Sequence, residues 1–332
     1  MKRLLEIRDP AALIGLVARA SLPAFDPEDL VRHTPDAHWI LLDEEGRAAG
    51  RCSLWWQQSM CHTGNRLGFI GHYAVDGAEN GYQLLANACK ELAARGCRLV
   101  VGPMDGNTWR NYRFLTEGNG EPPFFLEPVN PPEWPRQFVE YGFKPLANYY
   151  SSLDDRLDED DDSQARRAAR RMANLGVSLR SLESANYGEE LKAIYRVVAE
   201  SFRSGFLYQP MSETEFVAQY EQVRPYVRPE LVTIAMHEDR PIGFIFTLPD
   251  VLQARLGMPI ETAIIKTLSV LPDRRFAGLG TYLGIENRRA VREFGYRRMI
   301  HALMHESNKS RSISARYAST IFRRYTLFTR PL

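Results

Sequence analysis

The sequence predicts an α/β fold in which one structural unit occurs twice along the chain. The length of 332 residues suits about two domains of ordinary size. One pattern also occurs twice, in residues 39–54 (WILLDEEGRAAGRCSL) and 232–248 (VTIAMHEDRPIGFIFTL). Each segment has a strand, a charged turn that ends in arginine, a glycine three residues later and a second strand. This repeated hairpin predicts a duplication.

The similarity between the two copies continues beyond the hairpin. In each copy a third strand follows, then a helix that ends at a glycine, then a fourth strand. The matched residues are, in order, Arg47, Gly50, Val75 and Gly96 in the first copy and Arg240, Gly243, Val270 and Gly295 in the second. Because the matches keep their order, a duplicated unit explains them better than chance similarity of hairpins does.

The turn after the third strand of the second copy, VLPDRRFAGLGTYLG (270–284), is the most informative segment. Residues 263–270 (AIIKTLSV) are apolar and β-branched, which is typical of a buried strand. Residues 281–295 (TYLGIENRRAVREFG) place apolar side chains along one helical stripe and end at glycine. Such a turn directs unpaired backbone N–H groups and the positive end of the helix dipole at one point, so we expect it to bind a phosphate.

Two kinds of phosphate loop could produce this turn. Gly278, Gly280 and Gly284 form G-x-G-x-x-x-G, close to the dinucleotide motif, but that fold needs more strand–helix units than the remaining chain can supply. The full spacing is V-x-P-x-x-R-x-x-G-x-G, formed by Val270, Pro272, Arg275, Gly278 and Gly280. This spacing resembles the acetyl-CoA signature of the GNAT superfamily of acyl-CoA-dependent N-acyltransferases.

The resemblance implies two tandem GNAT-like domains, each with a mixed, mostly antiparallel twisted sheet flanked by helices. It also implies that an amine attacks the thioester of acetyl-CoA directly. Two parallel strands should splay so that the cofactor pairs with a free strand edge, and the pyrophosphate should bind the turn. The residues expected to bind acetyl-CoA are Leu268, Ser269, Val270, Arg274, Arg275, Phe276, Ala277, Gly278, Leu279, Gly280, Thr281 and Asn308.

The catalytic residues are expected at the end of the next strand, in residues 298–310 (RMIHALMHESNKS). Glu306 is the expected general base, partly buried and with its pKa raised by desolvation toward neutral pH. The resemblance implies that Tyr317 protonates the departing thiolate, and His305 is the second candidate for the base. His301 and His305 have the spacing of a helical metal pair, but no third ligand accompanies them, so we expect no metal.

The first copy lacks the phosphate loop. The distance from Val75 to Gly96 is four residues shorter than the matching distance in the second copy, and DGAENGY (76–82) has neither arginine nor G-x-G. The carboxylates of Asp76 and Glu79 would repel a pyrophosphate. We therefore expect one acetyl-CoA site, in the second copy, and a degenerate first copy that shapes the acceptor site or stiffens the pair.

The predicted domains are residues 1–153, the degenerate copy, and 171–332, the copy with the acyl-CoA site. A charged linker, 154–170, joins them, with an acidic run ahead of a basic helix. Helical patterns at 190–202 and 215–223 open the second copy, and the resemblance places them along one wall of the acceptor site.

An insertion in the first copy is rich in proline and aromatic residues: Trp109, Tyr112, Phe114, Phe124, Phe125 and Trp134. It should pack on its own domain or form a lid over a hydrophobic acceptor.

The composition narrows the function classes. A net charge of +1 argues against a dedicated nucleic-acid or membrane-surface protein. Charged residues interrupt the N-terminal apolar run, and the four cysteines form no C-x-x-C pair, so we expect a cytoplasmic location and reduced thiols. The expected partner is a small-molecule or peptide amine. Two alternatives stay open: a non-catalytic acyl-CoA sensor, and an aminoacyl-tRNA-dependent peptidyl transferase, which should lack the CoA loop.

Overall fold

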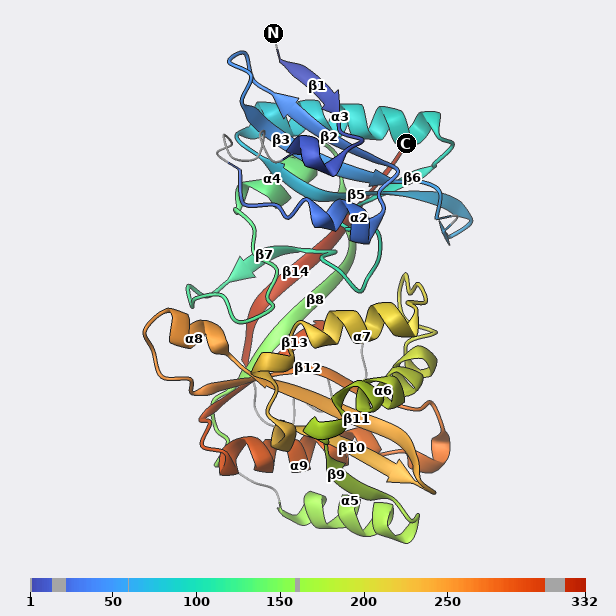
Figure 1. The fold of residues 1–332 in the computed structure, drawn as a ribbon, viewed down its shortest axis with the longest axis vertical. Helices are drawn as coiled ribbons and strands as arrows, with labels where there is room; N and C mark the ends of the chain where they lie inside the picture. Colours follow the sequence, from blue (N-terminus) through green and yellow to red (C-terminus); the bar gives the residue numbers. More distant parts are fainter. Residues whose placement is uncertain (1, 14–21, 59, 159–161, 308–319) are drawn as a thin grey trace. The chain divides into compact units, whose positions relative to one another are not determined.

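The computed structural model describes residues 2–13, 22–58, 60–158, 162–307 and 320–332, and the chain divides into two compact units (Figure 1). Unit 1 contains Met1–Glu117, Pro128–Asn148 and Tyr325–Leu332, and unit 2 contains Gly118–Glu127 and Tyr149–Arg324. In each unit a mixed, mostly antiparallel sheet is flanked by helices. The predicted fold class is therefore confirmed.

Unit 1 has the strand order β1-β2-β3-β5-β6-β14, and only β5 and β6 pair in parallel. Its strands are β1 (Arg3–Glu6), β2 (Ala37–Leu42), β3 (Ala48–Trp55), β4 (Cys61–His62), β5 (Asn65–Val75), β6 (Leu99–Gly102), β7 (Phe114–Gly118) and β14 (Thr320–Pro331). Its helices are η1 (Pro10–Ala12), α2 (Glu28–His33), α3 (Ala78–Ala94) and α4 (Glu133–Glu140). The apolar side chains of α3 pack into the core that the sheet forms with α4.

Unit 2 has the strand order β9-β10-β11-β12-β13-β8, and only β12 and β13 pair in parallel. Its strands are β8 (Lys144–Asp154), β9 (Ser178–Ser181), β10 (Val232–His237), β11 (Arg240–Pro249), β12 (Thr262–Val270) and β13 (Arg298–His305). Its helices are α5 (Asp162–Asn174), η2 (Ser184–Asn186), α6 (Tyr187–Ser201), α7 (Glu213–Glu221), η3 (Arg224–Tyr226), η4 (Pro229–Leu231), α8 (Val251–Arg255), η5 (Arg274–Phe276) and α9 (Leu279–Glu293). Both units thus repeat a hairpin, a third strand, a helix and a parallel fourth strand.

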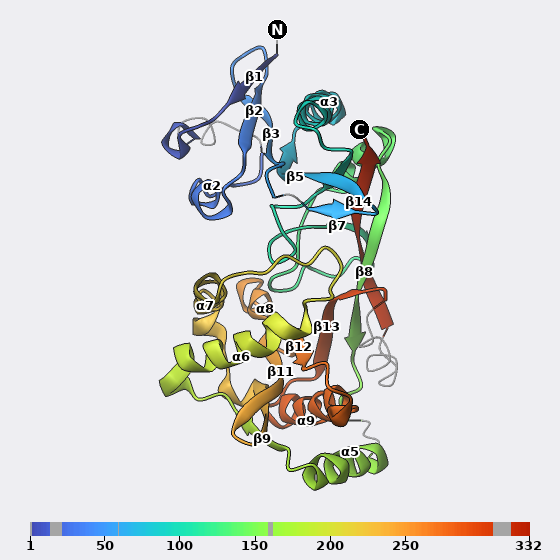
Figure 2. The same cartoon turned by 90° about the vertical axis from the view of Figure 1, so that its right-hand side faces the viewer.

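The sheet of unit 2 has helices on both faces (Figure 2). Ile245 packs with Leu279 and Leu283 of α9. Phe246 meets Tyr220 of α7 edge to face, with the ring centroids 5.1 Å apart. Because consecutive strand residues point to opposite faces, α9 and its neighbour α5 cover one face, and α7 with its neighbour α6 covers the other.

Two strands, β8 and β14, supply residues to both units. In unit 2, residues Tyr149–Asp154 of β8 pair antiparallel with β13. In unit 1, residues 328–331 of β14 pair antiparallel with β6. Each unit therefore takes one strand from the other half of the sequence. The predicted domains, 1–153 and 171–332, differ from these units. They place Gly118–Glu127 and most of β8 in the first domain and all of β14 in the second.

A buried ion pair joins the end of β8 to α9 within unit 2. The Arg288 Nε donates to Asp154 Oδ2 at 2.9 Å, and the two side chains are 3% and 0% exposed. The Arg288 guanidinium also donates to the backbone carbonyl of Arg156. Removing one member of such a pair leaves a buried charge uncompensated, at a cost of about 3–5 kcal/mol.

The aromatic insertion divides between the two cores. Phe114 and Trp134 surround Tyr73 in unit 1, with ring centroids 6.2 and 5.7 Å from it. Phe124 belongs to unit 2, where it packs with Ile264 and other apolar side chains. Of the two roles expected for the insertion, packing on a domain core or forming a lid, these three aromatic residues have the packing role.

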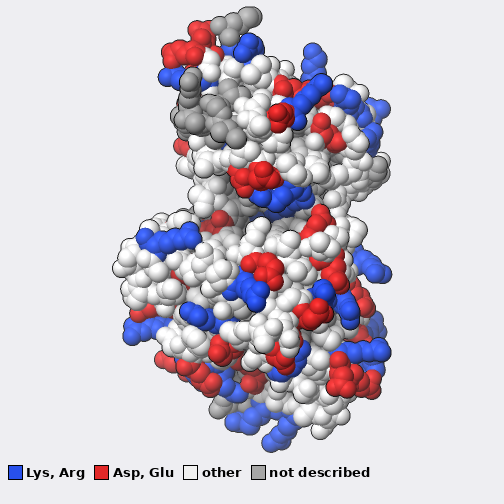
Figure 3. All heavy atoms as spheres, viewed as in Figure 1, with Lys and Arg blue, Asp and Glu red and all other residues white. Residues whose placement is uncertain are grey.

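Charges are mixed on the face drawn in Figure 3, where basic and acidic side chains lie interspersed over each unit. This distribution agrees with the net charge of +1 and gives that face no single-sign field of the kind that attracts a polyanion. Within the described ranges, no helix combines the length and the apolar character that a membrane crossing needs.

Candidate functional site

The predicted strand–turn–helix is present at β12, η5 and α9. Phe276 and Leu279 are buried in the core between α9 and the sheet, so only their backbones face the turn. Ala277 and Gly278 are exposed between them. Gly278 has φ of +97°, and a Cβ at this residue would meet no atom within 4 Å. The turn therefore presents bare backbone to the outside, as a phosphate loop requires.

The first amides of α9 are the part of this turn that could attract an anion. Tyr282 makes the first main-chain bond of the helix, with its N–H donating to the Gly278 carbonyl at 3.0 Å. The N–H groups of Leu279, Gly280 and Thr281 precede that bond, and no side chain caps the helix in the described structure. These N–H groups and the helix dipole favour an anion at this point.

Arg275 and Arg274 lie exposed beside these amides. The Arg275 guanidinium pairs with Asp273, with distances of 2.8 Å from Nε and 2.7 Å from Nη2 to Oδ2. This hydrogen-bonded pair lowers the pKa of Asp273 and keeps its carboxylate ionised. Arg275 is 69% exposed, so its guanidinium can turn from Asp273 toward a phosphate at the helix terminus.

Strands β12 and β13 separate halfway along their length. Their parallel pairing ends at Ile265 and His301, and β13 then continues along β8. Just beyond this point the pairing of β13 with β8 has a bulge between His301 and Met304, and Leu303 there has φ of +56°. Beyond this point, residues 267–270 of β12 pair with β11, and the other edge of residues 266–270 is free of ladder partners among the described strands. Leu268, Ser269 and Val270 lie on this edge.

Ser269 adds a polar group to the free edge. It is 4% exposed, and its Oγ has no hydrogen-bond partner within the described part of the chain. A buried hydroxyl without a partner is unfavourable, so this group suits a site that a polar ligand completes.

A second bulge, in β12, marks the point where the strands separate. Phe246 lies opposite Thr267 and Thr247 lies opposite Ile265, which leaves Lys266 as the extra residue. The bulge turns Lys266 and Thr267 toward Tyr220 of α7. The Lys266 Nζ lies 4.1 Å from the Tyr220 ring centroid, and Thr267 Oγ1 lies 3.0 Å from the Tyr220 hydroxyl. Bulges are frequent beside active sites because they redirect side chains.

The matching edge in unit 1 is closed by the chain itself. The Met104 N–H donates to the Ile70 carbonyl at 2.8 Å, and the His72 N–H donates to Asp105 Oδ1 at 2.6 Å. A Cβ on Gly71 would lie 2.2 Å from the Met104 carbonyl oxygen, so nothing fits between β5 and this loop. The backbone groups of Ile70 and His72 on this edge are therefore occupied, and the Val75 carbonyl, the counterpart of Val270, accepts from Trp134 Nε1 at 3.2 Å.

The N-terminus of α3 in unit 1 is also unsuited to a phosphate. A cavity of about 670 Å³ adjoins it, and its lining includes the carboxylates of Asp76, Glu133 and Glu140. Arg136 also lines the cavity, but its guanidinium pairs with Glu133 at 2.9 Å. The acidic lining opposes a pyrophosphate by charge repulsion.

Among known proteins, this chain has relatives of low sequence identity. No protein-family profile matches the sequence. The protein YghO of Escherichia coli is 20% identical over 290 residues, which cover 79% of this chain and 74% of YghO. The bacterial ceramide synthase of Caulobacter vibrioides is 24% identical over 220 residues, which cover 65% of this chain but only 56% of that relative.

Solved structures with low sequence identity share the whole architecture. A tandem GNAT protein from the clavulanic acid biosynthesis pathway matches 100% of this chain and 98% of its own, with a TM-score of 0.52 and 14% identity. A GCN5-related glucosamine N-acetyltransferase region of a fungal GH3 β-N-acetylglucosaminidase matches 99% of this chain and 38% of its own, with a TM-score of 0.55 and 11% identity. The chain has the tandem GNAT fold.

In the GNAT fold of unit 2, the expected catalytic residues occupy different environments. Glu306 is exposed in the turn after β13, so the partial burial expected for it is not found. His305 is half-buried, with its ring 4.9 Å from Tyr149 and 5.5 Å from Phe206. Its Nδ1 accepts the Ser307 N–H at 3.1 Å, so the neutral ring carries its proton on Nε2. The predicted residues Asn308 and Tyr317 lie outside the described residues.

His301 and His305 do not act as a pair in this GNAT unit. His301 is buried near Asp154 and Arg288, and burial lowers its pKa to about 4. The bulge after His301 changes the alternation of β13, and His305 contacts other side chains. Sequence reasoning missed Tyr220, Lys266 and Thr267. The one signal in the sequence that could have indicated the bulge in β12 is Lys266, a lysine within an otherwise apolar strand.

Proposed function

We propose that this protein is an acyl-CoA-dependent N-acyltransferase with a single cofactor site, in unit 2. The observation that carries the proposal is the free edge of β12, which leads directly to the uncapped N-terminus of α9. The residues fit the cofactor in chemistry. Peptide groups at the edge suit the amides of pantetheine, and the amides of Leu279 to Thr281 suit a pyrophosphate.

Bound acyl-CoA would supply an acyl group activated as a thioester. The backbone of Leu268 and Val270 would hold the pantetheine along β12, and a strand N–H near the bulge would face the oxygen on which charge develops. Arg275 would add a positive charge at the pyrophosphate. The acceptor would approach from the face of α7, where Tyr220, Lys266 and Thr267 meet.

An acceptor amine is protonated at neutral pH and must lose a proton before it attacks. We assign this step to Glu306, whose exposed carboxylate can be reached by an acceptor at the end of β13. His305 fits the opposite role, protonation of the departing CoA thiolate, because the tautomer inferred from its hydrogen bond with the Ser307 N–H has the donor on Nε2. For each substrate we propose the chemical class. The acyl donor is an acyl-CoA, of which acetyl-CoA is the simplest, and the acceptor is a primary amine.

The name of one relative widens the choice of substrates for the test. A protein named as a ceramide synthase forms an N-acylated long-chain amine, and it is 24% identical to this chain. The test therefore combines acyl-CoAs from acetyl to long-chain with a panel of polyamines, amino acids, peptides and long-chain amines, and measures release of free CoA thiol.

In this assay we expect Glu306→Gln to lower kcat about 10²-fold, the usual contribution of a general base, while CoA affinity stays unchanged. The matched control is Glu293→Gln, which removes an exposed carboxylate at the end of α9 and should retain full activity. Unchanged kcat in Glu306→Gln would place the base elsewhere. CoA binding without turnover of any pair would favour the sensor alternative.

A further inference from the structure

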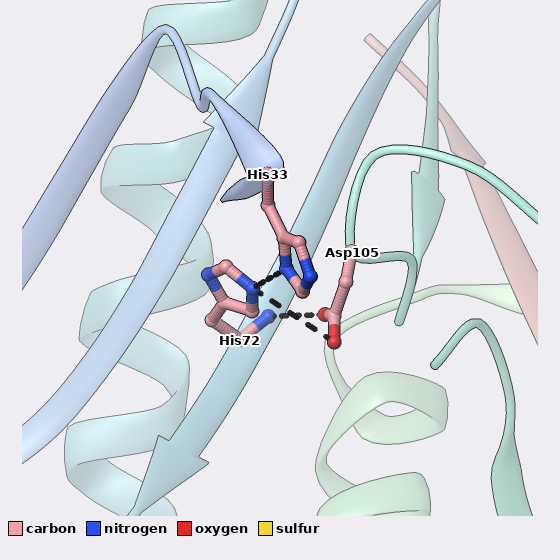
Figure 4. A group of neighbouring side chains, drawn as sticks. All are labelled: His33, His72 and Asp105. Carbon is pink, nitrogen blue, oxygen red and sulfur yellow. Dashed lines mark hydrogen bonds and ion pairs between the residues drawn. The ribbon is translucent and has the colours of Figure 1, made fainter. Parts of the chain in front are cut away.

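Unit 1 contains a cluster of metal-ligating side chains that the proposed function does not use. His33 ends α2, His72 lies in β5 and Asp105 follows β6, and their side chains converge on one point (Figure 4). The His33 Nδ1 and His72 Nε2 are 2.8 Å apart, and His72 Nε2 is 3.9 Å from Asp105 Oδ2. One ligand atom from each residue lies within 4.8 Å of the others.

One of these distances is shorter and one is longer than the ligand–ligand separation that a bound metal ion would impose. Ligands of a tetrahedral ion with bonds of 2.0–2.1 Å lie about 3.3 Å apart. The two ring nitrogens would have to separate slightly and the carboxylate oxygen would have to approach. The short contact between the nitrogens needs a shared proton, and a cation would replace that proton.

Outer partners already hold the two rings in the orientation that ligation requires. The His72 Nδ1 lies 2.8 Å from Ser53 Oγ, which in turn lies 2.7 Å from His38 Nδ1. The His33 Nε2 lies 3.5 Å from Asp29 Oδ1. Each imidazole thus directs one nitrogen into the cluster and the other at a polar group, as metal-bound histidines do.

The backbone is also arranged around the cluster. His72 has φ of +47°, which is uncommon for a residue with a side chain, and it lies in the bulged part of β5. Its N–H donates to Asp105 Oδ1. Arg110 donates to the carbonyls of His33 and Asp105, both at 3.2 Å, and so ties α2 to the loop after β6.

The charges around the cluster select against a hard cation. The carboxylates of Asp105 and Asp29 favour a positive ion, whereas the guanidiniums of Arg51 and Arg110 oppose it. With little net field, binding must come from direct metal–nitrogen bonds. Imidazole favours Zn²⁺ and its transition-metal neighbours over Ca²⁺ and Mg²⁺, which take oxygen ligands.

We propose that unit 1 binds one Zn²⁺ ion through His33, His72 and Asp105. The ion would join three elements, α2, β5 and the loop after β6, and would stabilise the loop that closes the free edge of β5. The His33 side chain is 17% exposed, so the ion can enter from its side. This site differs from the metal-free expectation drawn from His301 and His305, and it is independent of acyl transfer.

The test measures zinc in the full chain after growth with zinc and dialysis, by inductively coupled plasma mass spectrometry. We expect about one Zn²⁺ per chain, retained through dialysis, as for a site with preformed ligands. The His33→Gln variant should lose the ion. The matched control, His62→Gln, removes a histidine of β4 in the same unit and should keep it. His33 is the variant of choice because it is only partly buried and its loss should leave the fold intact.

A spectroscopic measurement on the unmodified chain accompanies the variants. Titration with Co²⁺ should produce the visible absorption bands of a four-coordinate nitrogen and oxygen site, and Zn²⁺ should abolish them. A chelator should lower the melting temperature and Zn²⁺ should restore it. Dialysed protein without zinc and without a Co²⁺ spectrum would overturn the proposal. Equal zinc content in His33→Gln and His62→Gln would do the same.

Discussion

Replacing Arg275 with glutamate and Gly280 with aspartate in one variant should abolish CoA binding. The glutamate would turn a positive side chain beside the loop into a negative one. The aspartate would place a carboxylate in the first turn of α9, where uncapped N–H groups face outward. That carboxylate would occupy the place of the pyrophosphate and repel it. We expect the dissociation constant to rise at least about 10²-fold, the equivalent of about 3 kcal/mol, by isothermal titration calorimetry.

The control variant changes the net charge of the chain by the same amount, but through two substitutions in unit 1. Ala78→Asp adds a carboxylate at the start of α3, the counterpart of α9, and Lys90→Glu reverses an exposed charge on the same helix. CoA affinity should be unchanged in this control. If both double variants bind CoA as the unmodified chain does, the loop at Gly278 is not the pyrophosphate site.

A fragment of residues 165–332 should fail to fold, although it contains the whole second copy predicted from the sequence. It lacks Tyr149–Asp154, the segment of β8 that pairs with β13. Without Asp154, Arg288 would remain buried without its carboxylate, which costs about 3–5 kcal/mol. The fragment also loses Leu153 and Leu157 from two apolar clusters. These losses approach the whole stability of an ordinary domain, about 5–15 kcal/mol.

The matched fragment for this experiment begins at Gly118 and ends at Leu332. It retains all of unit 2, including Gly118–Glu127 and β8. We expect it to show cooperative unfolding in urea by circular dichroism and to bind CoA, while the shorter fragment shows no transition. A cooperative transition in the 165–332 fragment would mean that the exchanged strand is dispensable.

The sequence allowed the fold class and the strand–turn–helix around Gly278 to be predicted because their signals are local. The apolar run at 263–270, the glycine pair at Gly278 and Gly280 and the helical stripe after them lie within about thirty consecutive residues. The hairpins repeat with a recognisable turn. Local signals of this kind fix element type and order, and the structure has both as predicted for β12 and α9.

The features that the sequence did not reveal depend on contacts between distant residues. The exchange of β8 and β14 follows from which strands pair, and no local pattern specifies that choice. The bulge at Lys266 becomes visible only in the register with β11. The cluster in unit 1 joins His33 to His72 across 39 residues and His72 to Asp105 across 33, so it forms no motif. Burial of Glu306 was expected from its neighbours in sequence, but the residue lies in an exposed turn.

The most direct test of the single-site account is the stoichiometry of CoA binding to the full chain by isothermal titration calorimetry. Unit 2 has an open strand edge and an uncapped helix, whereas in unit 1 Met104, Asp105 and Trp134 bond to the corresponding strand at Ile70, His72 and Val75. We predict one CoA per chain, with the heat of binding lost in the Arg275→Glu, Gly280→Asp variant. Two CoA molecules per chain, or no binding at all, would contradict the account.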